Sequence, residues 1–174
     1  RVHAILVTRS QPATASSSRS NSSWAPSPTS PAVLTPEKEV QVKILLADDD
    51  PVSRHILSET LRRWGYEVYC AADGEEAWLL LQDHDAPQLA VLDWMMPKLD
   101  GIDLCRRIRE RSSEPYIYVL LLTSKGQKQD IIEGMGAGAD DYILKPFDPG
   151  ELQMRLSAGR RIVRLQADLL EARE

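Results

Sequence analysis

The chain has 174 residues and a mass of 19.5 kDa, which suits one ordinary domain with extensions better than two full domains. Its hydrophobic share of 43% and charged share of 27% are those of a soluble globular protein. A formal net charge of -5 argues against nucleic acid as the main partner, because phosphate binding needs a basic surface. No apolar run approaches the roughly 18 residues of a membrane span, so we predict a cytoplasmic protein without membrane contact.

Residues 1–39 are dominated by Ser, Pro, Thr and Ala. Such a segment cannot bury enough apolar surface to order itself, so we predict a disordered tail. Arg1, Arg9 and Arg19 occur in it while acids are absent before Glu37, a composition also found in organellar transit peptides. Disorder is the preferred interpretation of the two.

From about residue 40, short apolar runs alternate with segments of helical period, which is typical of a parallel sheet with crossover helices. We predict strands at 42–48, 66–71, 88–93, 116–122 and 141–145, with helices following them. Helix starts are indicated by Asp50 before Pro51, by Asp73 three residues before Glu76, and by Asp148 before Pro149.

The last helical pattern runs from about 148 to 174 and is long enough to extend past the domain. Ala158, Ile162, Leu165, Leu169 and Ala172 follow one another at steps of four and three, which is heptad spacing. We therefore predict a globular domain over 40–157 and a helical linker with coiled-coil spacing over 158–174.

Polar residues stand where four of the predicted strands end. Asp48 and Asp49 end the first strand, Asp93 the third, Thr123 the fourth and Lys145 the fifth. The carboxyl ends of parallel strands share one edge of a sheet, so these side chains should meet there. Clustered carboxylates repel one another unless a cation lies between them, and an oxygen-only ligand set favours Mg²⁺ over Zn²⁺.

This arrangement predicts phosphoryl transfer. With Mg²⁺ bound by Asp48, Asp49 and Asp93, the Asp93 carboxylate on the central strand can attack phosphorus while the ion neutralises the developing charge. The Lys145 ammonium and the Thr123 hydroxyl can both donate to phosphoryl oxygens.

Four blocks, "LLADDDPVSR", "VLDWMMPKLDG", "LLTSKG" and "GADDYILKPF", resemble the receiver domains of response regulators in two-component signalling. The resemblance implies a flavodoxin-like, doubly wound five-stranded parallel (βα)5 fold. It also implies site roles: an acidic pocket of Asp48 and Asp49, the phosphoacceptor Asp93, the switch residues Thr123 and Tyr142, the phosphate-sensing Lys145, a metal ligand at the Met95 carbonyl and a cis bond before Pro146.

The resemblance further implies a phosphoprotein switch rather than an enzyme. Its phosphoryl donor would be a sensor histidine kinase or a phosphotransfer protein. We expect phosphorylation to change the face formed by the fourth helix, fifth strand and fifth helix. This face would then form a homodimer, and the heptads after Ala158 would transmit the change. Met95 replaces the polar residues often found at that position, so we also expect slow loss of the phosphoryl group.

Two other functions fit parts of the sequence. In a haloacid-dehalogenase-type phosphatase, Asp48 and Asp50 would be the paired acids of the first strand, but Asp50 is better explained as a helix cap. An interaction module without phosphorylation would leave the complete acceptor set unexplained. Within the family, the final segment resembles the linkers that join receivers to diguanylate cyclase domains, which favours a piece of a longer regulator. No output motif is present.

Several side chains have simpler explanations than function. We expect Asp140 and Asp141 to be exposed loop acids beside the site, Trp94 to be partly exposed, and Trp64 and Trp78 to pack in the core. Cys70 and Cys105 suit reduced, buried thiols. Gly134, Gly136 and Gly138 indicate a helix end and a turn, and the arginines of the last helix indicate a solvated face.

Overall fold

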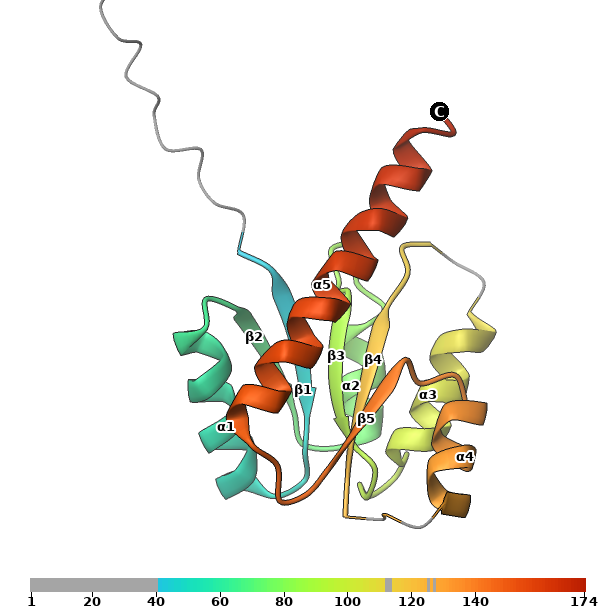
Figure 1. The fold of residues 1–174 in the computed structure, drawn as a ribbon. Helices are drawn as coiled ribbons and strands as arrows, with labels where there is room; N and C mark the ends of the chain where they lie inside the picture. Colours follow the sequence, from blue (N-terminus) through green and yellow to red (C-terminus); the bar gives the residue numbers. More distant parts are fainter. Residues whose placement is uncertain (1–40, 112–113, 125, 127) are drawn as a thin grey trace, which may run out of the picture. The chain divides into compact units, whose positions relative to one another are not determined.

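The computed structural model describes residues 41–174 except 112–113, 125 and 127, so the predicted tail at 1–39 lies outside the described residues. Strands and helices alternate through this part of the chain (Figure 1). The elements are β1 Lys43–Ala47, α1 Pro51–Arg63, β2 Glu67–Ala71, α2 Gly74–Leu80, β3 Leu89–Asp93, α3 Gly101–Glu110, β4 Tyr118–Thr123, α4 Lys128–Gly136, β5 Asp141–Leu144 and α5 Pro149–Glu171.

The five strands form one parallel sheet in the order β2-β1-β3-β4-β5. This confirms the predicted doubly wound fold, with β3 in the centre. The order reverses between β1 and β3, and ligands of such sheets bind beyond the carboxyl ends of the strands at this point. The first and third strands end there in Asp48 and Asp93.

Alternate residues of each strand enter two separate apolar layers. Ile44 and Leu46 pack with α1 and α5 on one face, whereas Leu45 and Ala47 pack with α2 and α3 on the other (Figure 1). Strands covered on both faces are apolar throughout, which is why β1, β3 and β4 appear in the sequence as uninterrupted apolar runs.

The predicted helix starts are confirmed by side-chain caps. The Asp50 carboxylate accepts hydrogen bonds from the backbone of Val52 and Ser53, and Asp73 accepts one from Glu76 at 2.8 Å. Asp148 accepts one from Gly150 at the start of α5. These bonds satisfy first-turn N–H groups that have no partner within the helix.

The glycine-rich stretch differs in part from the prediction. Gly138 has a φ of 99° and forms the expected turn, and Gly136 ends α4. Gly134, however, lies inside α4, where a Cβ atom would come within 3.2 Å of Leu121 and 3.4 Å of Trp94. The absence of a side chain therefore lets α4 pack closely on the sheet.

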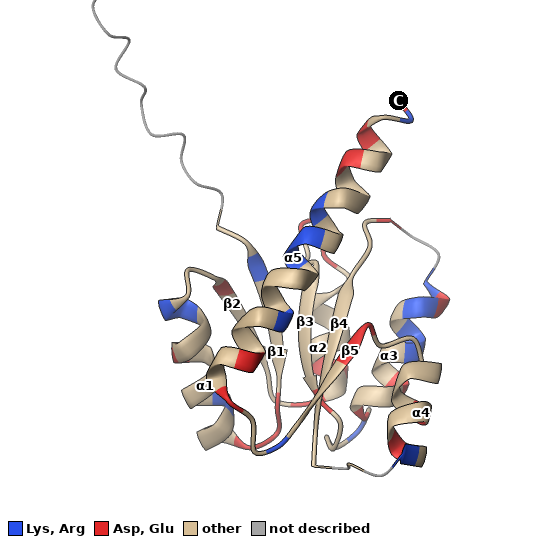
Figure 2. Cartoon of the chain, in the orientation of Figure 1, with Lys and Arg blue, Asp and Glu red and all other residues tan. Residues whose placement is uncertain are grey.

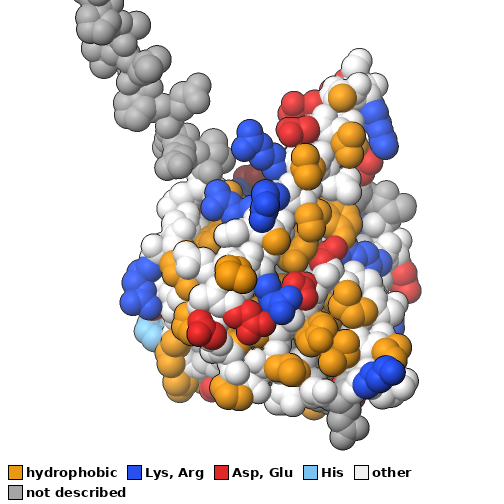
Figure 3. Space-filling view, in the orientation of Figure 1, with side chains coloured by type: hydrophobic (Ala, Val, Ile, Leu, Met, Phe, Trp, Pro, Cys, Tyr) orange, Lys and Arg blue, Asp and Glu red, His pale blue; other side chains and the backbone are white. Residues whose placement is uncertain are grey.

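Helix α5 has 23 residues and extends past the strands (Figure 1). Its last buried residue is Gly159, and beyond it Ile162, Leu165 and Leu169 are 38%, 62% and 58% exposed. Figure 3 shows apolar side chains along the outer face of this helix. No helix in the described part of the chain is long and apolar enough to cross a membrane.

Candidate functional site

Three carboxylates meet where β1 and β3 end. Asp48, Asp49 and Asp93 each have an oxygen atom within 4.8 Å of the others. Asp48 is completely buried and Asp93 is 8% exposed, whereas Asp49 is open to solvent. The three acids predicted from the strand ends are thus brought together at one edge of the sheet.

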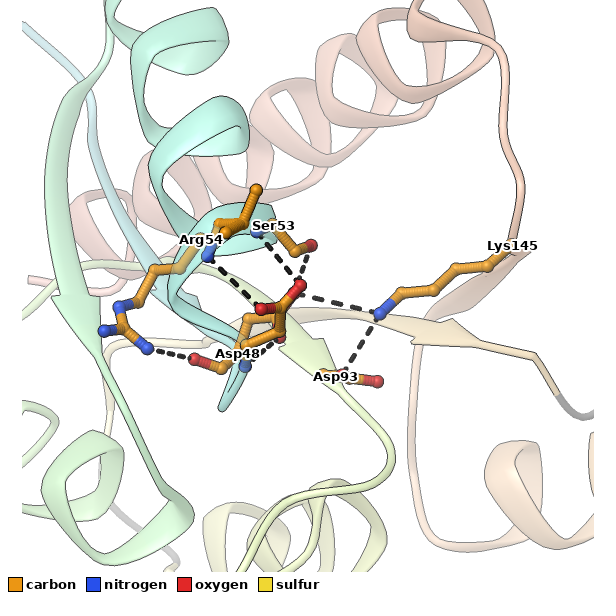
Figure 4. A network of polar contacts seen from close by, with 7 residues as sticks. Asp48, Ser53, Arg54, Asp93 and Lys145 are labelled. Atoms are coloured by element: carbon orange, nitrogen blue, oxygen red, sulfur yellow. Dashed lines mark hydrogen bonds and ion pairs between the residues drawn. The ribbon is translucent and has the colours of Figure 1, made fainter.

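The buried Asp48 carboxylate is held by the start of α1 (Figure 4). Its Oδ1 accepts a hydrogen bond from the Asp50 N–H at 2.9 Å, and its Oδ2 accepts one from the Ser53 hydroxyl at 2.7 Å. The Arg54 guanidinium donates to the Asp48 backbone oxygen at 2.7 Å. Neither Ser53 nor Arg54 was predicted from the sequence, although both lie in the first helical turn after an acidic strand end, which is a usable signal.

Lys145 connects the far strand to this cluster (Figure 4). Its ammonium donates to Asp93 Oδ2 at 3.1 Å and lies 3.8 Å from Asp48 Oδ2. Burial nevertheless raises the pKa of Asp93, an effect that Lys145 opposes and the Asp48 charge reinforces. One cation among three acids leaves the site with excess negative charge.

The donor set fits a divalent cation. Three carboxylates from two adjacent strand ends offer hard oxygen ligands, and one side of the cluster is exposed through Asp49. Mg²⁺ prefers a few carboxylate oxygens and retains water at other positions. Neither His55 nor His84 belongs to a metal-ligating cluster among the described residues, so a zinc site is not favoured there.

The remaining predicted site residues come from β4, β5 and the segment after β3. Thr123 is 2% exposed at the end of β4, and its backbone oxygen accepts a hydrogen bond from the Lys145 N–H at 2.8 Å. Tyr142 is half-buried against the core. Met95 is 57% exposed, and the Lys145–Pro146 bond is cis as expected.

Asp140 and Asp141 correct one prediction. They lie at the start of β5, where Asp141 is level with Leu120 of β4 and, through it, with Val91 of β3, two residues before Asp93. The half-buried Asp140 carboxylate pairs with Arg109 at 2.7 Å and also binds Tyr116 and the Val119 N–H. It joins α3 to the sheet and is not an exposed loop acid.

Trp94 corrects another prediction. Its side chain is only 4% exposed, because the residue after β3 turns into the layer beneath α4. Its backbone is held by a hydrogen bond to the Leu122 oxygen and by one from the Gly101 N–H. Trp64 and Trp78 pack against the core as expected, and the two thiols are free, with Cys105 buried and Cys70 half-buried.

Comparison with known proteins identifies this arrangement. The family model of the response regulator receiver domain matches residues 44–157. The chain belongs to the response-regulator receiver family. It is 49% identical over 115 residues to a probable transcriptional regulator, ycf27, of Cyanophora paradoxa, covering 66% of this chain and 46% of that protein. The chain thus spans about half the length of the curated relatives it matches.

Solved receiver structures have the same fold. A putative two-component response regulator with a GGDEF domain aligns with a TM-score of 0.66 and 32% identity, covering 71% of this chain and 51% of that one. The receiver domain of a sensor histidine kinase from Pseudomonas aeruginosa, with magnesium in its active-site cleft, aligns with a TM-score of 0.62 and 31% identity. That alignment covers 68% of this chain and 96% of the Pseudomonas chain.

Proposed function

We propose that this receiver domain accepts a phosphoryl group on Asp93 in a magnesium-dependent reaction. The observation that carries the proposal is the geometry of Asp93, whose buried carboxylate lies beside two further acids and 3.1 Å from the Lys145 ammonium. A receiver domain supplies a signalling function. We also propose that the protein is cytoplasmic and that these residues act as a signalling switch and not as an enzyme.

The proposed reaction forms one bond and breaks another. An Asp93 carboxylate oxygen attacks the phosphorus atom of a phosphohistidine, and the P–N bond breaks as the imidazole takes the electron pair. Lys145 and Thr123 donate to the transferred oxygens. A bound Mg²⁺ would be held by Asp48, Asp49, Asp93 and the Met95 carbonyl, and it would neutralise charge on the phosphoryl group.

A groove beside the site suits the docking of a donor protein. It has a volume of about 440 Å³ between α1 and the start of α5, where Val52, Ile56 and Phe147 supply an apolar lining. Val52 and Ile56 are 65% and 59% exposed at its edge. We propose that a histidine kinase or phosphotransfer protein packs here, because an apolar helix face would bring its histidine near Asp93.

The response to phosphorylation would pass through Thr123 and Tyr142. A Thr123 hydroxyl drawn to the phosphoryl group leaves space into which Tyr142 can turn, which changes the surface of α4, β5 and α5. We propose that this surface forms a homodimer. The chain would then divide into a receiver over 40–157 and a dimerising helix over 158–174.

Labelling with a small phosphodonor tests the acceptor. We expect the wild type to form an acid-stable, base-labile acyl phosphate with acetyl phosphate and Mg²⁺, and Asp93→Asn to lose it. Asp50→Asn is the matched control, because Asp50 caps α1 and should leave labelling intact. Incorporation that continues in Asp93→Asn would instead favour Asp48 and the phosphatase-type mechanism.

A further inference from the structure

A second hollow lies at the opposite edge of the sheet from Asp93. This groove has a volume of about 1000 Å³ and separates α5 from the body of the domain, where β1 and β3 begin. Lys43 stands on the body side, and Arg160, Arg161 and Arg164 stand on the helix side. The volume is at the upper end of the range for small-molecule sites, about 300–1000 Å³.

The groove is basic in a chain that is acidic as a whole. Among the described residues, four cations and a single acid, Asp85, line the groove, although the formal net charge of the chain is -5. Figure 2 shows this basic stretch on α5 close to the start of β1, with acids following only toward the end of the helix. Figure 3 shows basic side chains close together where α5 leaves the body of the domain.

Two of these cations lack partners in the described part of the chain. Arg161 and Arg164 are exposed and take part in no ion pair, hydrogen bond or ring contact recorded there. Arg160 lies over the Tyr66 ring, and Lys43 pairs with Asp85. Other arginines are neutralised locally, in the pairs Arg62–Glu59, Arg106–Asp103, Arg107–Glu75, Arg109–Asp140, Arg155–Asp141 and Arg173–Glu114.

We propose that this groove binds a soluble organic phosphate. Arg161 and Arg164 are three residues apart and therefore adjacent on the helix surface, so their guanidinium groups can hold neighbouring phosphate oxygens. Ser157 and Gln88 can donate to further oxygens of the ligand. The half-buried Val42 and Val163 line the groove and provide an apolar surface for the organic part of the ligand.

Such a ligand would connect the receiver body to the extending part of α5. Lys43 belongs to β1, whereas Arg161 and Arg164 lie after the last buried residue of the helix. An anion bound between them would hold the linker in one direction relative to the sheet. Binding of the organic phosphate would act on the linker independently of Asp93, which lies at the other edge of the sheet.

Binding can be measured by calorimetry with the full chain and ADP as the probe. The buffer contains no divalent cation, so that phosphate does not bind at the acidic site, and its ionic strength is low. We expect saturable binding to one site with a dissociation constant below about 1 mM. Pyrophosphate should bind several-fold more weakly, because it leaves the apolar wall uncovered.

Three variants separate this groove from general charge effects. Arg161→Ala/Arg164→Ala should weaken ADP binding by about tenfold or more. Arg106→Ala/Arg107→Ala removes the same charge from α3 on the other face of the sheet and should change the affinity less than about twofold. Asp85→Asn should tighten binding several-fold, because it removes the one acid that lines the groove among the described residues and releases Lys43.

Several results would overturn the proposal: no saturable binding of ADP, an equal loss of affinity in the two arginine pairs, or an affinity that Asp85→Asn leaves unchanged or lowers. Equal affinity for pyrophosphate and ADP would refute the role of the apolar wall. Binding to phosphatidylserine vesicles without binding to ADP would show a membrane surface instead. Phosphorylation of Asp93 is measured separately, so its success or failure does not decide these outcomes.

Discussion

At the scale of single residues, the environment of the Asp93 carboxylate disfavours its charged form. Burial raises the pKa of Asp93, and the neighbouring Asp48 charge raises it further although Lys145 donates to it. A folded-state pKa above the unfolded value means that ionised Asp93 destabilises the fold, and that protonation removes this effect. The excess negative charge that adds to the effect of burial on the pKa of Asp93 also favours binding of a cation beside it.

Removing the Asp93 charge should stabilise the metal-free protein. At neutral pH with a chelator, we expect Asp93→Asn to raise the thermal midpoint by a few degrees, about what 1 kcal/mol produces in a domain of this size. The difference in thermal midpoint between variant and wild type should be largest above the raised pKa of folded Asp93. It should disappear as pH falls below 3.8, the ordinary pKa of Asp. Calorimetry across pH measures it. Mg²⁺ should stabilise the wild type more than the variant. A difference in thermal midpoint between the two proteins that is the same with Mg²⁺ as with a chelator would contradict this explanation.

Met95 controls access to the acceptor in our interpretation. Its side chain is 57% exposed directly beyond β3, where its apolar bulk can keep water from an acyl phosphate on Asp93. We expect Met95→Asn to accelerate loss of the phosphoryl group several-fold, measured as release of labelled phosphate. The exposed Met154 on α5 offers a matched control, and Met154→Asn should leave the rate unchanged. An unchanged or slower rate of phosphoryl loss in Met95→Asn would contradict shielding by Met95.

At the scale of elements, close packing between α3 and β3 positions the acceptor. Gly101 begins α3, and a Cβ atom there would lie 2.4 Å from the Asp93 backbone oxygen and 3.0 Å from the Trp94 Cα. The Gly101 N–H also donates to the Trp94 oxygen. The segment between acceptor strand and helix is thus fixed by backbone contact, which leaves no room for a side chain.

Gly101→Ala should therefore destabilise the fold. We expect a loss of about 1–3 kcal/mol in the free energy of unfolding, the usual effect of overpacking, measured by urea denaturation. Gly136→Ala is the control, because a Cβ atom at the end of α4 meets nothing within 4 Å. That variant should be neutral or slightly stabilised, since alanine favours helix. Similar losses in both variants would show that the contact at Gly101 is not responsible.

At the scale of the whole molecule, the proposed phosphorylation site and the extending part of α5 lie at different ends of the domain. The acidic cluster stands at the carboxyl ends of the strands, and α5 extends from the other edge. Ile162, Leu165 and Leu169 form an exposed apolar stripe along the helix. In solution such a stripe is best covered by an equivalent helix, which suits the proposed homodimer.

Leu165 provides a test of the dimer. With the phosphate mimic beryllofluoride and Mg²⁺, we expect light scattering to show a doubled mass for the wild type and at least about tenfold weaker association for Leu165→Asp. Ala167→Asp introduces the same charge on the groove side of the helix and should still dimerise. An unchanged wild-type mass on addition of the mimic would contradict phosphorylation-driven dimerisation.

The alternation of buried strands and capped helices was predictable because it depends on residues close in the chain. Apolar runs, Asp-Pro caps and the acids at strand ends specified the five strands and the set Asp48, Asp93 and Lys145. The parallel order then made their meeting at one edge a geometric necessity. The sequence by itself therefore determined the fold and the residues gathered at the candidate site.

Only the tertiary structure decided features that depend on distant partners. Asp140 is half-buried because Arg109, 31 residues earlier, and the Val119 N–H, 21 residues earlier, bind its carboxylate. Trp94 is buried because Gly134 lets α4 approach it. Likewise, the sequence alone indicates only that Arg161 and Arg164 lie on a solvated helix face. The structure places them beside the start of β1, where no described acid neutralises them. Burial and charge balance follow from contacts between elements, which local sequence does not specify.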